Sequence, residues 1–208
     1  CSYCNNCRYT AMHGNNRMRF RSVDHFLGEM EYALEKFGSC EVVGFGDDDF
    51  LIRPFKQLEE FAEKYPKRIG IPYAIAVSAN TYSDKKMELL LDTGLYAGQM
   101  GVQSGSQRVL DEVFNRKIPV VKTKEVLTKL EKLNKDHGIK AFVDFIIDNP
   151  YETKEDILKT YHYIVDISPE TKLNIFVLAF FPGTPIFERA LEDGYIEQYL
   201  PYLMTDFR

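Results

Sequence analysis

The chain begins with the sequence CSYCNNC, which places Cys1, Cys4 and Cys7 within seven residues. Thiolates this closely spaced bind a soft metal ion or an iron–sulfur cluster. The alternative is a disulfide or thiols without a role, and the polar residues further along the chain argue against it. The segment therefore predicts a metal or cluster site. Its spacing also allows a self-contained ligand set made of all three cysteines.

Polar groups follow the apolar stretches that we interpret as strands. In a parallel barrel the carboxyl ends of the strands share one rim, and the chemistry takes place there. We therefore expect these polar groups to line a single site. The groups are Asp47-Asp48-Asp49, Ser78 with Asn80, Gln103-Ser104-Gly105, Asp148-Asn149-Pro150 and Pro182-Gly183-Thr184.

The elements that must position these groups alternate between strand and helix. Apolar residues at three- and four-residue steps predict a helix after Ser22, and Gly38 ends it. The same pattern recurs down the chain. The predicted strands are 41–45, 73–77, 97–102, 142–147 and 173–180, and the later predicted helices begin near residues 54, 83, 107, 123, 153 and 187.

Strand, loop and helix in repetition indicate parallel strands with helical crossovers, so the fold class is α/β. A full eight-unit barrel takes about 250 residues. The five strands of this 208-residue chain, with one more expected before the cysteines, make about six units. The sequence therefore predicts one domain over residues 1–208, a partial, open TIM-type barrel whose first strand lies upstream. Residues 195–208 are rich in aromatic side chains and form a C-terminal extension that either packs on the last helix or docks a neighbouring domain.

Composition limits the cellular environment and the binding partners expected for this protein. The net charge of -5 argues against a general nucleic-acid surface, and no apolar run approaches the roughly 20 residues that span a bilayer. Four cysteines, three of them clustered, suit a reducing cytoplasm better than a disulfide framework. We expect the fourth, Cys40, to be a small buried hydrophobic residue.

Six landmarks occur in the order typical of a radical S-adenosylmethionine (SAM) domain. The ordered set resembles that superfamily, and most of all the branch joined to an N-terminal cobalamin-binding domain, which includes methyltransferases, methylthiotransferases and an anaerobic porphyrin-ring cyclase. The landmarks are the cysteine loop, Arg19-Phe20-Arg21-Ser22, residues 45–50 (FGDDDF), residues 101–106 (GVQSGS), residues 150–153 (PYET) and residues 182–185 (PGTP).

The resemblance implies a particular ligand set for the cluster. In the family motif three residues separate the first cysteine from the second, and an aromatic residue precedes the third. Tyr3 matches that aromatic, so Cys1 and Cys4 correspond to the second and third ligands of a [4Fe–4S] cluster. The first ligand is then expected upstream of residue 1, and Cys7 is not a ligand.

The resemblance also assigns the methionine end of SAM. Asp47 and Asp48 follow the strand at which the family contacts the methionine ammonium, and a carboxylate suits that cation. A solvated turn is the alternative for this pair. Arg116 lies where the family carries a basic residue for the methionine carboxylate, which an Arg fork matches bidentately. The alternative for Arg116 is a helix-end charge that faces water.

The resemblance also assigns residues to the nucleoside end of SAM. The resemblance implies that Ser78, Asn80 and Gln103, with Ser104 beside it, bind the ribose, although the branch often carries Glu at the position of Gln103. Ile147 corresponds to the apolar strand end that packs on adenine. The family commonly has Gly at the next position, where this chain has Asp148.

Taken together, the resemblance implies a radical SAM enzyme. Its cofactors are a [4Fe–4S] cluster and SAM, with cobalamin held by an adjacent domain outside this chain. Its partners are a small-molecule substrate and an electron donor of the flavodoxin or ferredoxin type. Methyl transfer or another modification at an unactivated carbon is the favoured reaction. The competing hypothesis is a cluster- or zinc-binding scaffold without radical chemistry.

Overall fold

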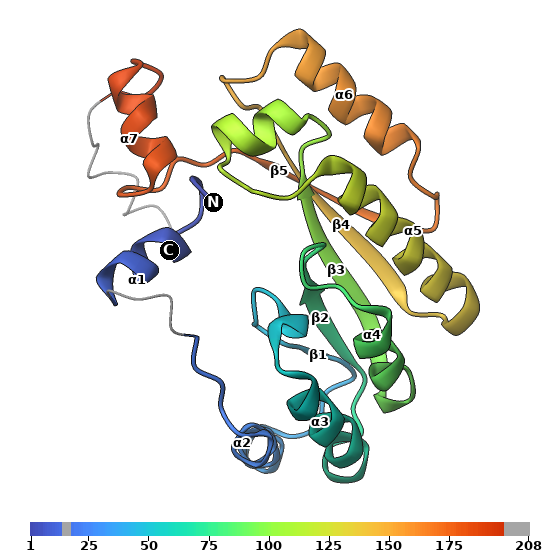
Figure 1. Ribbon diagram of the computed structural model, residues 1–208. Helices are drawn as coiled ribbons and strands as arrows, with labels where there is room; N and C mark the ends of the chain where they lie inside the picture. Colours follow the sequence, from blue (N-terminus) through green and yellow to red (C-terminus); the bar gives the residue numbers. More distant parts are fainter. Residues whose placement is uncertain (14–17, 198–208) are drawn as a thin grey trace.

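The computed structural model describes residues 1–13 and 18–197. Its centre is a five-stranded parallel sheet in the order β1-β2-β3-β4-β5. The sheet curls into an open half-barrel (Figure 1), which confirms the predicted fold class. The strands are Val43–Gly44 (β1), Tyr73–Val77 (β2), Leu95–Gln103 (β3), Lys140–Ile147 (β4) and Lys172–Val177 (β5).

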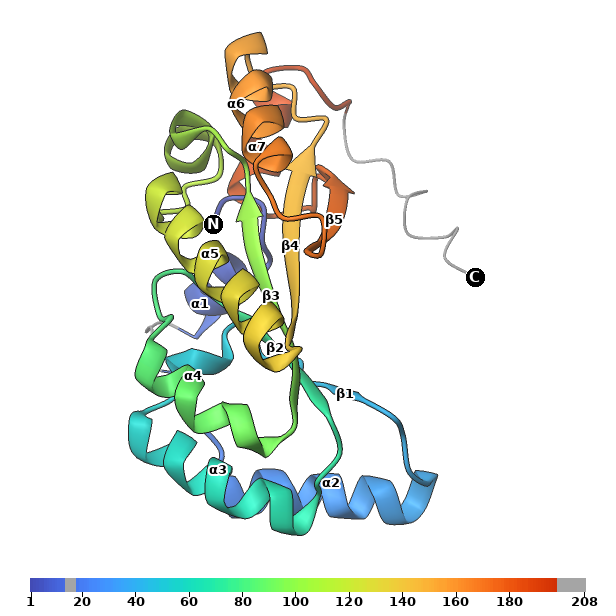
Figure 2. The same ribbon diagram turned by 90° about the vertical axis from the view of Figure 1, so that its right-hand side faces the viewer.

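Helices cover the outer face of the sheet. Figures 1 and 2 show α3, α4, α5 and α6 on that face, and α1 and α7 on the inner side beside the N-terminus. The α-helices are Asn6–Met12 (α1), Val23–Phe37 (α2), Phe55–Arg68 (α3), Asp84–Leu90 (α4), Val120–His137 (α5), Lys154–Val165 (α6) and Pro185–Glu192 (α7). Three short turns complete the described chain: the 3₁₀ helices Phe50–Ile52 (η1) and Leu91–Thr93 (η2), and the π-helix Val109–Val113 (η3).

Local sequence explains where the main helices begin and end. The Ser22 side chain accepts a hydrogen bond from the His25 amide and so caps α2. Thr153 and Asp156 form a reciprocal capping box at the start of α6. Gly138 ends α5 in the left-handed conformation that glycine adopts at low cost.

The sheet has two differently packed faces. Because neighbouring residues of a strand point to opposite faces, Val143 and Phe145 of β4 are buried under the outer helices, whereas Asp144 and Ile146 face the inside of the barrel. A cluster of aromatic rings fills the core beneath β1 and β2. Its members are Phe45, Phe50, Phe61, Tyr65 and Tyr73, with centroids 4.8 to 6.4 Å apart in the contacting pairs.

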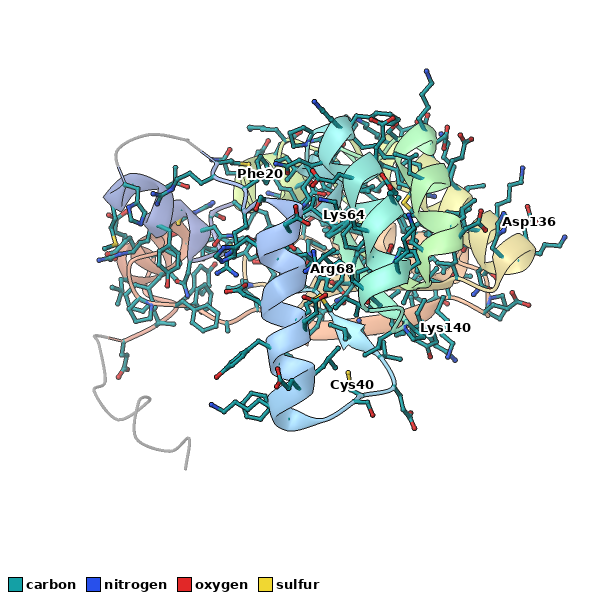
Figure 3. All side chains as sticks on the ribbon, turned by 90° about the horizontal axis from the view of Figure 1, so that it is seen from below. Phe20, Cys40, Lys64, Arg68, Asp136 and Lys140 are labelled. Atoms are coloured by element: carbon teal, nitrogen blue, oxygen red, sulfur yellow. The ribbon has the colours of Figure 1, made fainter. Side chains whose placement is uncertain are left out.

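Three ion pairs hold α2 against α3. Lys64 and Arg68 of α3 both contact Asp24 at 2.7 and 2.9 Å. Arg68 also bonds to Glu31 at 2.7 Å. Figure 3 shows Lys64 and Arg68 at the junction of the two helices. These groups are largely exposed. We therefore expect the ion pairs to orient α2 and to contribute little to the free energy of unfolding.

Two expectations for the first part of the chain differ from the structure. The polar and basic composition of residues 8–21 predicts a loop, but residues 8–12 are helical and belong to α1. The prediction that Cys40 is buried is wrong: its side chain is exposed in the connection after α2 (Figure 3), because β1 begins only at Val43. Of the aromatic extension, Tyr195 packs on Tyr151 at 5.1 Å, while Tyr199, Tyr202 and Phe207 lie outside the described residues.

No helix in residues 1–13 and 18–197 combines the length and the apolar character needed to cross a bilayer.

A buried polar network joins the loop after β3 to the start of α6. The Asp156 carboxylate accepts hydrogen bonds from Arg108, Ser106 and Thr153. Burial alone would raise the pKa of Asp156, but these donors outweigh it and hold that pKa well below its usual range. The network fixes the strand ends that carry Gln103 and Ser104.

We predict that Asp156→Asn lowers the free energy of unfolding by about 3 kcal/mol, because the amide removes the negative charge beside the Arg108 guanidinium and replaces one of the two acceptor oxygens with a donor. Chemical denaturation at neutral pH measures the loss. Since the folded-state pKa is depressed, the difference between wild type and variant should be present above the ordinary aspartate pKa and shrink as the pH falls below it. Asp166→Asn, at an exposed pair with Lys124, is the matched control. An equal loss in both variants would contradict the network's role.

Candidate active site

A cleft of about 690 Å³ opens at the carboxyl ends of β1 to β4. It brings together residues from the cysteine loop, three strand ends and the segment after η3, as expected for a parallel barrel. Seven of the predicted site residues line it: Cys1, Asp47, Asp48, Ser78, Asn80, Gln103 and Arg116. Tyr3 reaches the same place through a hydrogen bond from Arg116, while Cys4, Ser104 and Ile147 lie outside its lining.

Each aspartate after β1 has a different partner. Arg53 donates to both oxygens of Asp47 at 2.9 and 3.1 Å. Asn6 of the cysteine segment donates to Asp48 at 2.6 Å. Asp49 is turned toward the protein, where its side chain caps η1 and accepts from Thr81. All three carboxylates line the cleft, but Asp49 is committed to capping η1, which leaves Asp47 and Asp48 as the candidates for a ligand.

Arg116 lines the same cleft from the segment after η3. One terminal nitrogen donates to the Gly101 carbonyl at 2.7 Å, and the other to the Tyr3 hydroxyl at 3.3 Å and, weakly, to the Cys1 sulfur at 3.8 Å. Its Nε is buried and has no hydrogen-bond partner among the described residues. The cleft therefore combines carboxylates from the loop after β1 with a guanidinium from the segment after η3.

Gln103 adopts a backbone conformation that is rare for its type. Its φ is +73°, in the left-handed region, at the point where β3 leaves the sheet. Its buried Oε1 has no partner within the described chain. Gly101 makes room for it, because a Cβ at that position would lie 2.4 Å from the Gln103 amide nitrogen. Strain and an unsatisfied buried acceptor in one side chain point to a bound ligand.

The thiols of the cysteine loop are free of disulfides. The Cys7 sulfur points back to the carbonyl of Cys4 at 2.9 Å. Within residues 1–13 and 18–197, no three His, Cys, Asp or Glu side chains come close enough together to hold a metal ion. The described chain therefore does not preform a site from Cys1, Cys4 and Cys7.

A second, more apolar cavity of about 350 Å³ adjoins the cleft and shares Gln103 and Asp144 with it. Tyr3 and Ile146 form its floor together with residues at the end of β5. Burial raises the pKa of the Tyr3 hydroxyl, with Arg116 acting in the opposite direction, so this hydroxyl stays protonated. Tyr3 also packs edge-on against Phe114 at 4.9 Å.

The structure does not bring Ile147 to this site. Ile147 lines a different hollow, on the outer side between β4 and α6. Its neighbour Ile146 faces the inside of the barrel and contacts the Tyr3 cluster. Both residues are apolar, and the available signal was that Ile146 lies two residues after Asp144 and therefore on the same face of β4.

Sequence reasoning also missed Asp144. This carboxylate lines both cavities and accepts hydrogen bonds from the Gln99 and Asn174 amides, each at 2.9 Å. It has no salt-bridge partner in the part of the chain that the structure describes. Its place between apolar residues of a strand was the available signal, because a lone carboxylate inside such a strand needs a reason.

Ser104 lies behind the cleft rather than in its wall. It is fully buried and contacts Thr160 at 3.1 Å and Glu152 at 3.5 Å. Burial raises the pKa of Glu152 to about 7, and the nearby Asp156 carboxylate acts in the same direction. Ser104 thus supports the strand end from the outside and is coupled to a carboxylate that titrates near neutral pH.

We predict that Glu152→Gln stabilises the domain by about 1–2 kcal/mol at pH 8, after allowing for the solvent that still screens this half-buried group. A raised pKa means that the folded state binds the proton more tightly than the unfolded state does. Ionised Glu152 therefore destabilises the folded wild type. This effect is absent below about pH 4.5, grows up to about pH 7 and is complete above it. Denaturation at pH 5 and pH 8 measures it, with the exposed Glu155→Gln as control. A stability gain that does not depend on pH would refute the assignment.

A half-barrel of parallel strands with a cysteine loop at its carboxyl rim defines a class of cluster-binding enzyme domains. The profile of the Radical SAM superfamily matches residues 1–164, and the chain belongs to this superfamily. The match includes the cysteine loop, β1 to β4 and most of α6.

Individual relatives agree with the branch that the sequence resembles. The chain is 23% identical over 199 residues to an uncharacterized methyltransferase of Pyrococcus horikoshii, covering 93% of this chain and 40% of the relative. It is 26% identical over 211 residues to the anaerobic magnesium-protoporphyrin IX monomethyl ester cyclase of Cereibacter sphaeroides, covering 97% and 32%. The chain thus spans well under half the length of these relatives.

The fold agrees as well. The radical SAM methyltransferase TsrM from Kitasatospora setae, solved with cobalamin and a [4Fe–4S] cluster bound, superposes with a TM-score of 0.67 at 16% identity. The superposition covers 83% of this chain and 32% of TsrM. These comparisons confirm the resemblance to radical SAM domains, including a methyltransferase that carries cobalamin. Enzymes of this superfamily use a [4Fe–4S] cluster and SAM.

Proposed function

We propose that this domain binds SAM in the cleft and uses it, together with a [4Fe–4S] cluster at Cys1 and Cys4, to start radical chemistry on a small-molecule substrate. The observation that carries the proposal is opposite charge in one cleft, whose lining includes Asp47, Asp48 and Arg116. A free amino acid end carries an ammonium and a carboxylate, which this arrangement matches.

Arg116 has the stronger claim at the methionine end. Its Nε lacks a partner, and its terminal nitrogens are already aligned by Gly101 and Tyr3, so the guanidinium is preorganised for a carboxylate. Asp47 is already paired with Arg53. Asp48 accepts a hydrogen bond from the neutral Asn6 amide. It is therefore the better candidate to bind the ammonium.

The remaining residues fit a nucleoside. Ser78, Asn80 and Gln103 line the middle of the cleft, and we add Asp144 as an acceptor for ribose hydroxyls because it lies at the junction of the two cavities. The smaller apolar cavity beside Tyr3 suits adenine, with Ile146 rather than Ile147 as the aliphatic contact. Ser104 then acts from behind by fixing the strand end.

The Gln103 Oε1 and Arg116 Nε, without partners in the described chain, fit a polar ligand. The free thiol of Cys1 lies beside Arg116, and with Cys4 of the same loop it fits part of a cluster site. When bound, a reduced [4Fe–4S] cluster supplies the electron that cleaves the sulfonium C–S bond of SAM to methionine and a 5′-deoxyadenosyl radical. The residues of this chain bind and orient SAM at that site. A third thiolate ligand is expected from the polypeptide before Cys1.

The direct test is anaerobic reconstitution of the full-length protein with iron and sulfide, followed by addition of dithionite and SAM. Mass spectrometry should detect 5′-deoxyadenosine, formed when the radical abstracts hydrogen. A reconstituted protein that binds iron but gives no 5′-deoxyadenosine would favour the scaffold hypothesis instead.

For the reaction class we propose cobalamin-dependent methyl transfer, supported by the methyltransferase relatives and by the fold shared with cobalamin-containing TsrM. The electron donor is proposed to be a flavodoxin or ferredoxin. We predict that the purified full-length protein carries a corrinoid, which its absorption spectrum and mass spectrometry will reveal. If activity is retained in a corrinoid-free preparation, the cobalamin proposal fails while the radical proposal stands.

A further inference from the structure

Ser2 lies between the two proposed cluster ligands and is the only buried residue among residues 1–13. Its side chain and backbone are 7% exposed, whereas Cys1 and every residue of α1 are partly or fully exposed. Because this loop buries so few apolar side chains, other interactions must fix its conformation. The hydrogen bonds of Ser2 do so.

Three hydrogen bonds hold Ser2 in place. Its amide donates to the Phe114 carbonyl at 2.7 Å, and its hydroxyl donates to the Val113 carbonyl at 2.5 Å. Its own carbonyl accepts from the Ile186 amide at 3.1 Å. All of its donor and acceptor groups are therefore used within the protein.

The partners of Ser2 are the free ends of two helices. Val113 is the last residue of η3, and Phe114 follows it, so their carbonyls lack partners further along that helix. Ile186 lies in the first turn of α7, where amides are equally without an intrahelical acceptor, and the Thr184 side chain makes no capping bond there. Ser2 thus completes the C-terminal end of η3 and the N-terminal end of α7 at once.

Two neighbours reinforce this attachment on the same side of the barrel. Tyr3 packs on Phe114, and the Arg8 guanidinium passes so close to Gly183 that a Cβ there would lie 1.8 Å from it. The cysteine loop is therefore docked on the η3–α7 side of the barrel. Toward β1, Asn6 donates a side-chain hydrogen bond to Asp48.

We propose that Ser2 is a positioning residue that sets the placement of Cys1 and Cys4, and with it the stability and electronic environment of the cluster they bind. The inference rests on the proposed function for its readout. Ser2→Ala removes the hydroxyl donor and leaves the buried Val113 carbonyl unsatisfied, so the loop loses the bond that fixes it between the two thiols. Ser2→Thr keeps the hydroxyl.

The test compares reconstituted full-length wild type, Ser2→Ala, Ser2→Thr and the control Asn5→Ala, whose exposed side chain makes no capping bond in the same loop. We expect Ser2→Ala to lose iron to a chelator about tenfold faster, and to broaden the electron paramagnetic resonance signal of the reduced cluster. Ser2→Thr should stay close to wild type. Equal rates and spectra in wild type and Ser2→Ala would overturn the proposal, as would a loss in Asn5→Ala as large as in Ser2→Ala.

Amide hydrogen exchange of the iron-free protein separates this proposal from the function on which it rests. If wild type takes up no cluster, the proposed function fails, yet the attachment can still be measured. Ser2→Ala should then raise exchange at Ile186 and in residues 1–8, and Asn5→Ala should not. Unchanged exchange at Ile186 would refute the role of Ser2 without any reference to iron.

Discussion

Cys1→Ala and Cys4→Ala in the full-length protein should each abolish the charge-transfer absorption near about 400 nm that thiolate-bound iron gives after reconstitution. Each change removes one of the three thiolates proposed to hold the cluster, so the expected effect is loss of the cluster rather than a shift in its properties. Both thiols are free of disulfides and lie on either side of the fixed Ser2-Tyr3 pair.

Cys7→Ala distinguishes the two ligand sets. The Cys7 sulfur points to the Cys4 carbonyl, and the described chain does not bring the three thiols together. We therefore expect Cys7→Ala to retain the absorption band. Cys40→Ala, at an exposed cysteine in the connection after α2, is the matched control for loss of a thiol. Loss of the band in Cys7→Ala together with its retention in Cys1→Ala would reverse the assignment.

The second large effect is expected at Arg116. Arg116→Ala should weaken SAM binding by roughly ten- to a hundredfold, because a charge-assisted hydrogen bond to a carboxylate contributes about 1.5–3 kcal/mol. Arg116→Lys should restore only part of the affinity, since a point charge replaces a fork that Gly101 and Tyr3 have already aligned. Equilibrium dialysis or calorimetry with the reconstituted protein measures both variants.

Lys85→Ala serves as the control. It removes one positive charge from an exposed side chain that makes no hydrogen bond or ion pair within the described residues. If Arg116→Ala binds SAM as tightly as this control does, Arg116 is a structural link between Gly101 and Tyr3 rather than a SAM ligand. Titration with methionine alone tests which end of the molecule is affected. The affinity for free methionine should fall in Arg116→Ala by a factor similar to that for SAM.

Sequence patterns predicted the fold well because each level of the pattern agreed with the next. Apolar stretches of strand length, helices at three- and four-residue steps and polar groups after the strands all indicated one parallel sheet. The cleft-lining residues were found for the same reason, since Asp47, Ser78 and Gln103 each follow a strand directly.

The structure departs from the sequence-based placement where side-chain type alone carries too little information. Ile146 and Ile147 are both apolar, and what distinguishes them is that Ile146 lies two residues after Asp144 and so shares its face of the strand. The hydrogen bonds of Asp144 with Gln99 and Asn174 become visible only in the folded sheet. The same holds for Ser2, whose partners are helix ends far along the chain.

That distance has a consequence for biosynthesis. Ser2 is tied to Val113, 111 residues later, and to Ile186 near the end of the described chain. While a ribosome is still making the domain, the first residues have left it but the helix ends that receive them do not yet exist. The cysteine loop therefore reaches its final geometry only after α7 has been synthesised. Delivery of iron and sulfide to this domain is consequently expected to follow translation rather than accompany it.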